Sequence, residues 1–220
     1  MLVVIEGIDK SGKNTQAKLL AKKFIDSRLF SFPRYETVVG KLIKTNLKGE
    51  WTVSSTESKY DQRTISSINA MVLQCLMLAD KVEAGLDITG RQAEDAITIC
   101  DRYWQSAICY GGVDGLDEDW LYKLNRLLPR PDVNILIDTP INVALSRGRD
   151  GRPDEPDRYE KDSAFLYEVR RKYLKLWAEA DVTNASWYVI DGTQPIDVIH
   201  DHIVTFMSRH RRHDARRPVG

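Results

Sequence analysis

Short apolar runs alternate along the chain with stretches of helical periodicity. The runs of strand length cover residues 2–6, 29–32, 96–101, 133–138 and 187–191. Several are continuous rather than alternating, which is typical of strands buried on both faces of a parallel sheet. Helical patterns separate the runs, so the order is that of repeated β-α-β units. The pattern predicts one α/β domain with a five-stranded parallel sheet.

Two of the helical segments are informative. Residues 13–27 carry Leu19, Leu20, Phe24 and Ile25 at helical spacing. Residues 57–83 read as one long helix whose apolar side chains surround most of its circumference. A helix that is apolar on so many faces needs more than one packing partner. That partner is either the core of the same chain or a second subunit.

Two segments lack a core pattern. Residues 147–161 contain no hydrophobic residue before Tyr159, together with glycines, prolines and dense mixed charge, which predicts a mobile loop. Residues 209–220 are basic, and we expect a flexible tail. A single basic run is insufficient to predict nucleic-acid binding. No linker divides the chain, so residues 1–208 are expected to form a single domain.

Composition narrows the setting. Of 220 residues, 42% are hydrophobic and 29% are charged, and the formal net charge is zero. No overall field would therefore attract nucleic acid or an acidic membrane. The odd number of cysteines, three, without metal-ligand spacing argues against a disulfide framework. The apolar start is too short for a signal peptide or membrane span. We expect a cytoplasmic protein.

The stretch GIDKSGKNTQ, residues 7–16, predicts a phosphate-binding loop. It follows a predicted strand and opens a predicted helix, so backbone N–H groups and the helix N-terminus would face phosphates. Lys13 would reach the β- and γ-phosphates of ATP. The alternative, a glycine turn with a chance Gly-Lys pair, is disfavoured by this context. The expected ATP-binding residues here are Gly7, Lys10, Ser11, Gly12, Lys13, Asn14 and Thr15.

Asn14 stands where such loops carry a magnesium-binding hydroxyl. An amide oxygen can bind a hard cation, but it is a neutral ligand of different length. Thr15 carries a hydroxyl, but it lies one position after the residue that binds magnesium in such loops. Mg²⁺ accompanying ATP is therefore expected to depend mainly on phosphates, waters and a carboxylate elsewhere. Asp101, at the end of an apolar strand, is the candidate; its alternative role is a turn residue or an ion-pair partner of Arg102.

Further motifs follow the loop in order: SFPRY (31–35), DRYWQSAICY (101–110), RPDVNILID (130–138), the block RGRDGR to DRYEKD (147–162) and DGTQP (191–195). With them, residues 1 to 208 resemble the thymidylate kinase family of nucleoside-monophosphate kinases. The resemblance implies a three-layer α/β/α P-loop kinase fold, a lid at 147–157, a homodimer, and transfer of phosphate from ATP to dTMP.

A phosphate acceptor is already anionic at neutral pH, so the reaction needs positioning and charge neutralisation rather than a general base. The resemblance implies catalytic roles for Lys13, Arg102 and the lid arginines Arg147, Arg149 and Arg152, with Lys10 as a helper. At least one lid arginine is expected to be only a solvated charge. Arg147 and Thr193 would also contact ATP.

The resemblance further assigns the acceptor site. Asp9 would accept the sugar 3′-OH or help to organise the metal, so the metal candidates are Asp9, Asn14 and Asp101. Arg34 and Arg102 would hold the acceptor phosphate or the transferring group, and Tyr110 would lie beneath the deoxyribose and disfavour a 2′-OH. The full set of expected substrate-binding residues is Asp9, Phe32, Pro33, Arg34, Tyr35, Met77, Lys81, Arg102, Ser106, Tyr110 and Tyr159.

The nucleobase pocket departs from the family pattern. Relatives place an aromatic residue and an arginine four positions apart, whereas this chain has Met77 and Lys81. This spacing still puts both residues on one helix face. Methionine covers a base with less shape specificity than a phenyl ring. Lysine can donate a hydrogen bond to a base carbonyl, but it lacks the planar, forked guanidinium of arginine. We hypothesise a pyrimidine with a 4-carbonyl and looser discrimination at C5, so that dUMP or a 5-modified dUMP is also accepted.

Two alternatives to a dTMP kinase remain at this stage. One is a phosphate-loop kinase for another small acceptor, which the SFPRY and DRY motifs disfavour. The other is an inert nucleotide-binding protein, suggested by Asn14 and the altered base pocket. The complete set of cationic residues argues against the inert protein.

Overall fold

A computed structural model describes the chain except for residues 54–59, 95, 148–157, 160, 181–185 and 215–220. The strands are β1 (Leu2–Glu6), β2 (Arg28–Ser31), β3 (Thr98–Asp101), β4 (Val133–Asp138) and β5 (Ser186–Asp191). The helices are α1 (Lys13–Lys23), α2 (Val38–Leu47), α3 (Gln62–Ala93), α4 (Trp104–Val113), α5 (Glu118–Asn125), α6 (Ile141–Arg147), α7 (Ser163–Ala178) and α8 (Ile196–Asp214).

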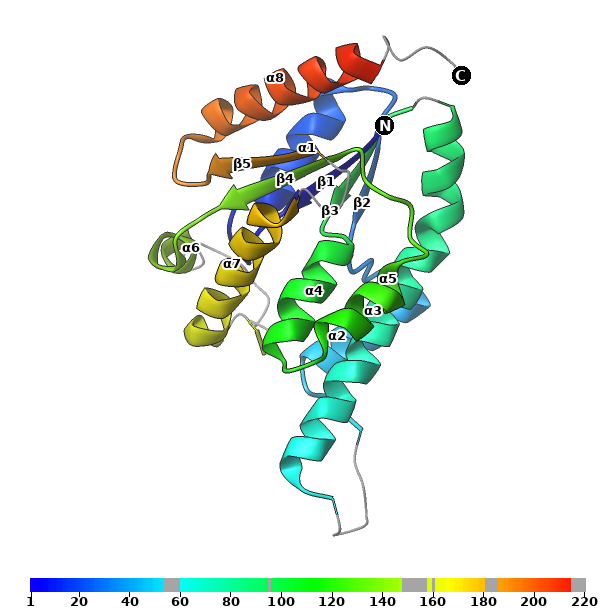
Figure 1. Cartoon of the computed structure of the whole chain (residues 1–220), viewed down its shortest axis with the longest axis vertical. Coiled ribbons are helices and arrows are strands. Elements are labelled where there is room, and N and C mark those ends of the chain that lie inside the picture. Colours follow the sequence, from blue (N-terminus) through cyan, green and yellow to red (C-terminus); the bar gives the residue numbers. More distant parts are fainter. Residues whose placement is uncertain (54–59, 95, 148–157, 160, 181–185, 215–220) are drawn as a thin grey trace.

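The strands form one five-stranded parallel sheet in the order β2-β3-β1-β4-β5. Strand β1 is central and wholly buried. Its alternate side chains enter different layers, because successive strand residues point to opposite faces. Val3 and Ile5 pack with α1 and α8, whereas Leu2 and Val4 pack with α3, α4 and α5 (Figure 1). The predicted three-layer α/β/α architecture is confirmed.

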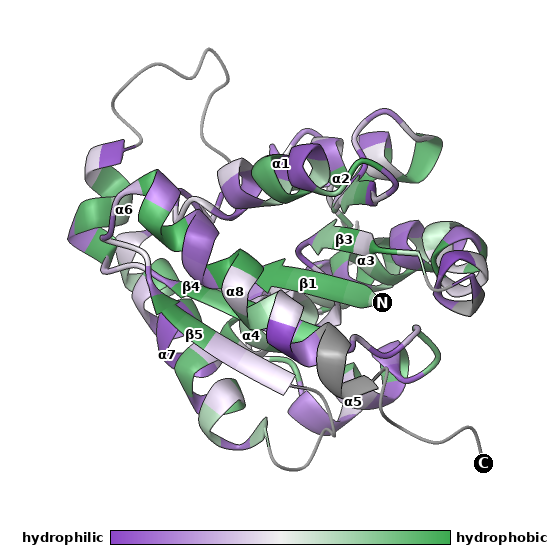
Figure 2. Ribbon diagram, turned by 90° about the horizontal axis from the view of Figure 1, so that it is seen from above, coloured by the Kyte–Doolittle hydropathy of each residue, from purple (hydrophilic) through white to green (hydrophobic). Residues whose placement is uncertain are grey.

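Hydropathy follows these layers. Figure 2 shows the hydrophobic strands β1 and β4 enclosed by helices in which hydrophilic and hydrophobic residues alternate. A third apolar cluster joins α2, α3, α4 and α7 and includes Leu136 of β4. The cluster includes Ile8 of the phosphate loop and therefore supports that loop.

Several predicted boundaries shift. Strands β1 and β4 match the prediction, whereas β2 begins at Arg28 and β3 only at Thr98. Helix α1 ends at Lys23 rather than at residue 27, because Phe24 leaves the helical conformation and packs against the core. Helix α3 begins at Gln62, where the Asp61 side chain accepts a hydrogen bond from the Thr64 backbone N–H.

Helix α3 continues to Ala93, ten residues beyond the predicted end at residue 83. By length and composition, its stretch Gln62–Gln92 would suffice to cross a membrane. However, α3 packs against α2, α4 and α5 and buries the charged residues Asp80 and Lys81. Helix α3 is therefore held in the domain along one side, and 33% of its most apolar 18-residue window is buried.

The predicted lid and tail are described only in part. Arg147 is the last residue of α6, and residues 148–157 lie outside the described part of the chain. Helix α8 extends to Asp214, so its end does not coincide with the expected tail boundary at residue 209. Basic residues are good helix formers, which lets the helix continue past its last apolar contacts.

Candidate functional site

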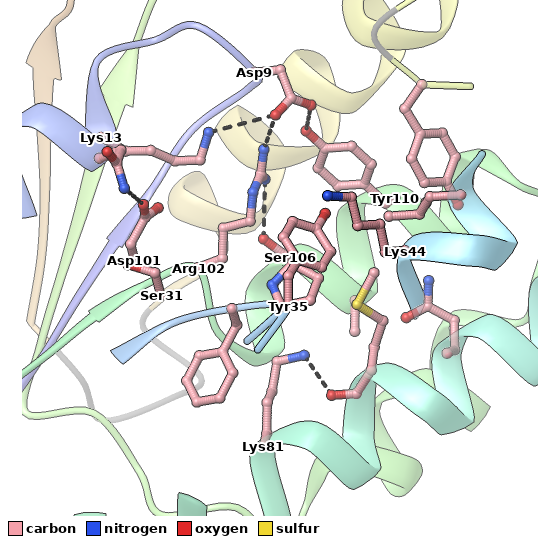
Figure 3. A pocket seen from close by; sticks show the side chains of 18 of the residues that line it. Asp9, Lys13, Ser31, Tyr35, Lys44, Lys81, Asp101, Arg102, Ser106 and Tyr110 are labelled. Carbon is pink, nitrogen blue, oxygen red and sulfur yellow. Dashed lines mark hydrogen bonds and ion pairs between the residues drawn. The ribbon is translucent and has the colours of Figure 1, made fainter. Parts of the chain in front are cut away.

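A cavity of about 680 Å³ opens at the carboxyl ends of β1, β2 and β3 (Figure 3). Ligands of open α/β sheets bind at this edge. Most of the expected substrate residues line the cavity. The expected residues found there are Asp9, Lys13, Asn14, Phe32, Pro33, Tyr35, Met77, Lys81, Asp101, Arg102, Ser106, Tyr110 and Tyr159.

The phosphate loop runs from β1 into α1 beside this cavity. Gly7 has a φ of 149°, and a Cβ there would lie 2.6 Å from Ser11 Oγ and 2.8 Å from the Ile137 backbone oxygen. Only glycine fits this turn. Gly12 has a φ of 101° at the N-cap of α1. The cap position carries no side-chain hydrogen bond, so the first N–H groups of α1 are available to a phosphate.

Charged groups converge on Asp9, as Figure 3 shows. Arg102 Nη2 lies 2.5 Å from one Asp9 oxygen, and Lys13 Nζ lies 3.8 Å from the same atom. The Tyr110 hydroxyl donates to the other oxygen at 2.9 Å. Burial alone would raise the pKa of Asp9, but the charges of Arg102 and Lys13 outweigh it and hold the pKa well below its usual range. Asp9 therefore remains a carboxylate that fixes two cations.

Lys13 is only 7% exposed and also donates to the Ile8 backbone oxygen at 3.1 Å. Burial and the neighbouring charge of Arg102 lower the pKa of Lys13, whereas Asp9 opposes that shift. Arg102 has a backbone φ of 67°, which is uncommon for a residue with a side chain. Such strain concentrates at functional sites. The two cations stand side by side, as a polyanionic ligand would require.

Sequence reasoning missed Glu6, the buried last residue of β1. Its carboxylate accepts from the Tyr103 N–H at 2.8 Å and the Ser106 N–H at 3.3 Å, at the start of α4. It also accepts from the hydroxyls of Ser106 and Tyr173, each at 2.8 Å. Because α4 has no cap from its own N-cap side chain, Glu6 supplies one from another element. Ser106 in turn contacts Arg102 at 3.4 Å.

Asn14 and Asp101 are brought together at the start of α1. Asn14 Nδ2 donates to Asp101 Oδ2 at 2.9 Å. The other Asp101 oxygen, Oδ1, is buried without a hydrogen-bond partner within the described residues. A lone carboxylate oxygen next to an amide is a suitable donor set for a hard cation. The alternative role of Asp101 as an ion-pair partner of Arg102 is not observed, since Arg102 pairs with Asp9.

The opposite end of the cavity is lined by Phe32, Met77 and Lys81. Lys81 is 3% exposed, donates to the Met77 backbone oxygen at 2.9 Å and lies 5.8 Å from the centre of the Phe32 ring. Burial lowers the pKa of Lys81 to about 8, with Asp80 and Glu6 opposing the shift and Arg102 adding to it. Met77 and Lys81 thus share one face of α3, as their spacing predicts.

Arg34, which is expected to bind phosphate, pairs with two acidic residues of α3. Its Nε is 2.9 Å from Asp80 Oδ1, and its Nη2 is 2.5 Å from Glu83 Oε2. It is not among the residues that line the cavity. The buried Asp80 carboxylate requires a cationic partner, and Arg34 provides it. Thr15 is exposed on α1, also outside the cavity lining.

Arg147 connects two loops rather than entering the cavity. It donates to the Ser11 backbone oxygen at 3.2 Å and to the Gly192 backbone oxygen at 2.7 Å. The adjoining Thr193 donates through its N–H and its hydroxyl to Asp191. The phosphate loop and the DGTQP loop are therefore neighbours. The other two lid candidates, Arg149 and Arg152, lie outside the described residues.

The cavity includes side chains that sequence analysis did not single out: Lys18, Ser31, Lys44, Leu47, Lys48, Gln74 and Ala107. Lys44 and Lys48 come from α2 and the residue that follows it, and Lys44 Nζ lies 5.7 Å from the centre of the Tyr35 ring. Their four-residue spacing was the available signal, because it places both on one helix face. Lysines at that spacing are common on solvated faces, so the signal was weak.

Comparisons with known proteins agree with this architecture. The model of the family described as thymidylate kinase matches residues 5–203. A probable thymidylate kinase of Methanocaldococcus jannaschii is 32% identical over 208 residues, which cover 94% of this chain and 95% of that protein. The thymidylate kinase of Schizosaccharomyces pombe is 31% identical, covering 97% and 94% respectively. In fold, the chain is similar to the solved thymidylate kinase of Candida albicans, with a TM-score of 0.77 and 24% identity over 96% of this chain and 92% of that one.

Proposed function

We propose that this chain, which belongs to the thymidylate kinase family, transfers the γ-phosphoryl group of ATP to the 5′-phosphate of dTMP. The observation that carries the proposal is the pairing of Lys13 and Arg102 around Asp9 at one end of a cavity of nucleotide size. Two phosphate groups that approach each other repel, and this cluster supplies positive charge where they would meet.

The chemistry asked of the protein is positioning. The N–H groups of the loop and of the first turn of α1 would receive the ATP phosphates, with Lys13 as a point charge beside them. Arg102 would contact oxygens of the acceptor phosphate or of the transferring group. The Asp9 carboxylate would hold both cations in place and, through an unused lone pair, accept the 3′-OH of the sugar. No side chain is required to remove a proton from the acceptor.

Mg²⁺ is the finer part of the proposal. Asp101 Oδ1 fits the role of metal-facing oxygen because it is buried without a partner among the described residues. Asn14 orients Asp101 through its amide nitrogen, so the loop would contribute to the metal site mainly indirectly. Mg²⁺ held by Asp101 would supply positive charge that partly neutralises the phosphates. Asp9 remains a second candidate near the metal.

The arginines of residues 147–157 complete the proposal. We assign Arg147 to the ATP side, because it already ties the phosphate loop to the DGTQP loop that contains Thr193. We assign one of the pair Arg149 and Arg152 to the transferring phosphoryl group when the lid covers the site, and the other to a solvated charge. Closure of the lid would exclude water and limit hydrolysis of ATP.

We propose further that the chain forms a homodimer through α3. Its outer face carries Ile68, Met71, Val82 and Leu86, all exposed and at helical spacing. A contiguous apolar face of this kind on a single chain commonly marks an interface. Sedimentation at micromolar concentration would test the assignment, since the mass of one chain would contradict it.

The remaining assignments are residues 1–208 as one domain, a cytoplasmic location, and no membrane or specific nucleic-acid partner. One sheet that takes strands from Leu2 to Asp191 supports the single domain. The free thiols Cys75, Cys100 and Cys109 suit a reducing compartment.

A coupled assay of nucleoside-diphosphate formation tests the function directly. The chain would be supplied with ATP, Mg²⁺ and a panel of monophosphates that includes dTMP, dUMP and 5-hydroxymethyl-dUMP. We expect dTMP to be the preferred acceptor. Equal kcat/KM for all three would favour a broader deoxypyrimidine kinase instead, and binding of ATP and dTMP without turnover would show an inert protein.

A further inference from the structure

Gln74 is a buried polar residue for which the proposed reaction has no role so far. It lies on α3, is 3% exposed and lines the cavity. Its Oε1 atom is buried and has no hydrogen-bond partner among the residues that the structure describes. Burying an amide in this way is unfavourable unless something satisfies it. A ligand in the cavity is the natural source of the missing partner.

The position of Gln74 on the helix places it at the nucleobase end. Gln74, Met77 and Lys81 follow one another at three- and four-residue steps, so they share one face of α3, and all three line the cavity. On the facing helix, α4, a Cβ at Gly111 would lie 3.3 Å from Gln74 Cδ. The neighbouring cavity residue of α4, Ala107, offers no hydrogen-bonding side chain. Gln74 and Lys81 are therefore the polar groups that α3 contributes to the cavity.

The donors and acceptors of these two residues suit one kind of base edge. Thymine and uracil present a carbonyl at C4, an N3–H donor and a carbonyl at C2. Cytosine presents an amino group at C4 and an acceptor at N3. An amide alone fits either ring by rotating through half a turn, because it carries both a donor and an acceptor. Lys81 only donates, so it favours the C4 carbonyl over an amino group and removes the ambiguity.

We infer that Gln74 is a specificity-determining residue, whose Oε1 accepts from N3–H and whose Nε2 donates to the C2 carbonyl of a thymine or uracil base. The inference rests on the proposed function for the identity of the occupant. Beyond that function, the inference states how the Watson–Crick edge of the base is recognised. The buried amide of Gln74 gains its hydrogen-bond partners only when the nucleotide is bound. A base that lacks N3–H leaves Oε1 unsatisfied, and such sites discriminate strongly.

The test is a cycle that combines a variant with a modified ligand. Calorimetry would measure the Kd of dTMP and of 3-methyl-dTMP, which lacks N3–H, for the wild type and for Gln74→Ala. We expect the wild type to disfavour 3-methyl-dTMP by about tenfold or more, and the preference to shrink by about that factor in the variant. Gln74→Leu, which keeps the volume, should weaken dTMP and dUMP equally and leave 3-methyl-dTMP unchanged. If the alanine variant fails to fold, the leucine variant provides the test by itself.

Gln92→Ala is the matched control, because Gln92 lies on the same helix and bonds to the Arg130 backbone oxygen outside the cavity. It should leave both Kd values unchanged. An unchanged preference in both Gln74 variants, with all ligands weakened alike, would overturn the inference and leave Gln74 a packing residue. Because binding is measured without turnover, a wild type that binds dTMP but forms no dTDP would refute the proposed function alone.

Discussion

The two ends of the cavity are built in different ways. At the phosphate end, defined by Asp9, Lys13, Arg102 and Tyr110, each oxygen of Asp9 already has a partner. The contacts join the phosphate loop to Arg102, which follows β3, and to α4. At the base end, defined by Phe32, Gln74, Met77 and Lys81, Gln74 Oε1 has no partner among the described residues and Lys81 bonds to the backbone of its own helix.

This difference implies that the phosphate end determines the rate of turnover, whereas the base end determines selectivity for the base. The phosphate end is organised before any ligand arrives, which is the arrangement that stabilises charge in a transition state without further reorganisation. The base end is completed by what binds there, so its hydrogen bonds report on the identity of the base. Substitutions at the first end should therefore change turnover, and those at the second should change preference or pH dependence.

The largest effect is expected at the phosphate end, for Lys13→Ala. The change removes the point charge nearest the β- and γ-phosphates, and kcat should fall by about a thousandfold. The assay is dTDP formation at saturating ATP and dTMP. Lys22→Ala, on the exposed side of the same helix, is the control and should retain normal turnover. Wild-type turnover in the Lys13 variant would contradict the loop assignment.

Asp9→Asn should come next, because it keeps the shape but removes the charge that holds Lys13 and Arg102. Hydrogen bonds to charged groups contribute about 1.5–3 kcal/mol, so kcat/KM should fall by roughly 10- to 100-fold.

The same variant has a signature in stability. The pKa of Asp9 is lowered on folding, so its stabilising effect is present above the ordinary carboxyl pKa of about 3.9 and is lost as the pH falls further. The difference in free energy of unfolding between wild type and Asp9→Asn should therefore be constant near pH 7 and shrink below about pH 4. A pH-independent difference would show that Asp9 is not held as a carboxylate.

At the base end, Lys81→Arg should alter pH dependence. The pKa of Lys81 is lowered to about 8 by burial, so its ammonium fraction falls as the pH rises through that value. The KM for dTMP in the wild type should thus increase between pH 7 and pH 9, by about tenfold at most. Arginine stays protonated throughout, and its profile should be flat over this range. Identical profiles would indicate that Lys81 does not contact the base.

Asn14→Ser is expected to have the smallest effect and tests whether the phosphate end is as complete as it appears. A serine hydroxyl would add a direct metal ligand but lose the hydrogen bond to Asp101. We expect the Mg²⁺ concentration for half-maximal turnover to change by only about two- to fivefold, since the net value of one hydrogen bond is about 1 kcal/mol. A change of a hundredfold would mean that residue 14 holds the metal itself.

The sequence predicted the architecture and the loop because both depend on local patterns. Continuous apolar runs identified β1 and β4 at their observed bounds, and the glycine spacing identified the turn at Gly7. Helix α3 runs past its predicted end at residue 83 and continues through Gly85 and Gly90. Packing of Ala84 and Ile88 against the sheet outweighs the poor helix propensity of these two glycines.

The contacts at the site that the sequence did not reveal join partners far apart along the chain. Arg34 was expected at a phosphate, but it is held by Asp80 and Glu83, which are 46 and 49 positions away. Glu6 was overlooked because a glutamate at the end of a strand resembles a turn residue. Its role becomes visible only when α4 and α7 bring their donors to it.

The hydrogen bonds of Arg147 also set an order of events during synthesis of the chain. During synthesis the phosphate loop leaves the ribosome before Arg147, which follows Ser11 by 136 positions, and before its second partner, Gly192, which comes a further 45 positions later. A nascent chain therefore carries the complete phosphate-loop sequence long before Arg147 can form the two hydrogen bonds that hold this loop. We expect ribosome-bound chains that end before Gly192 to retain ATP poorly, and chains that include Gly192 to retain ATP once that residue has left the ribosome.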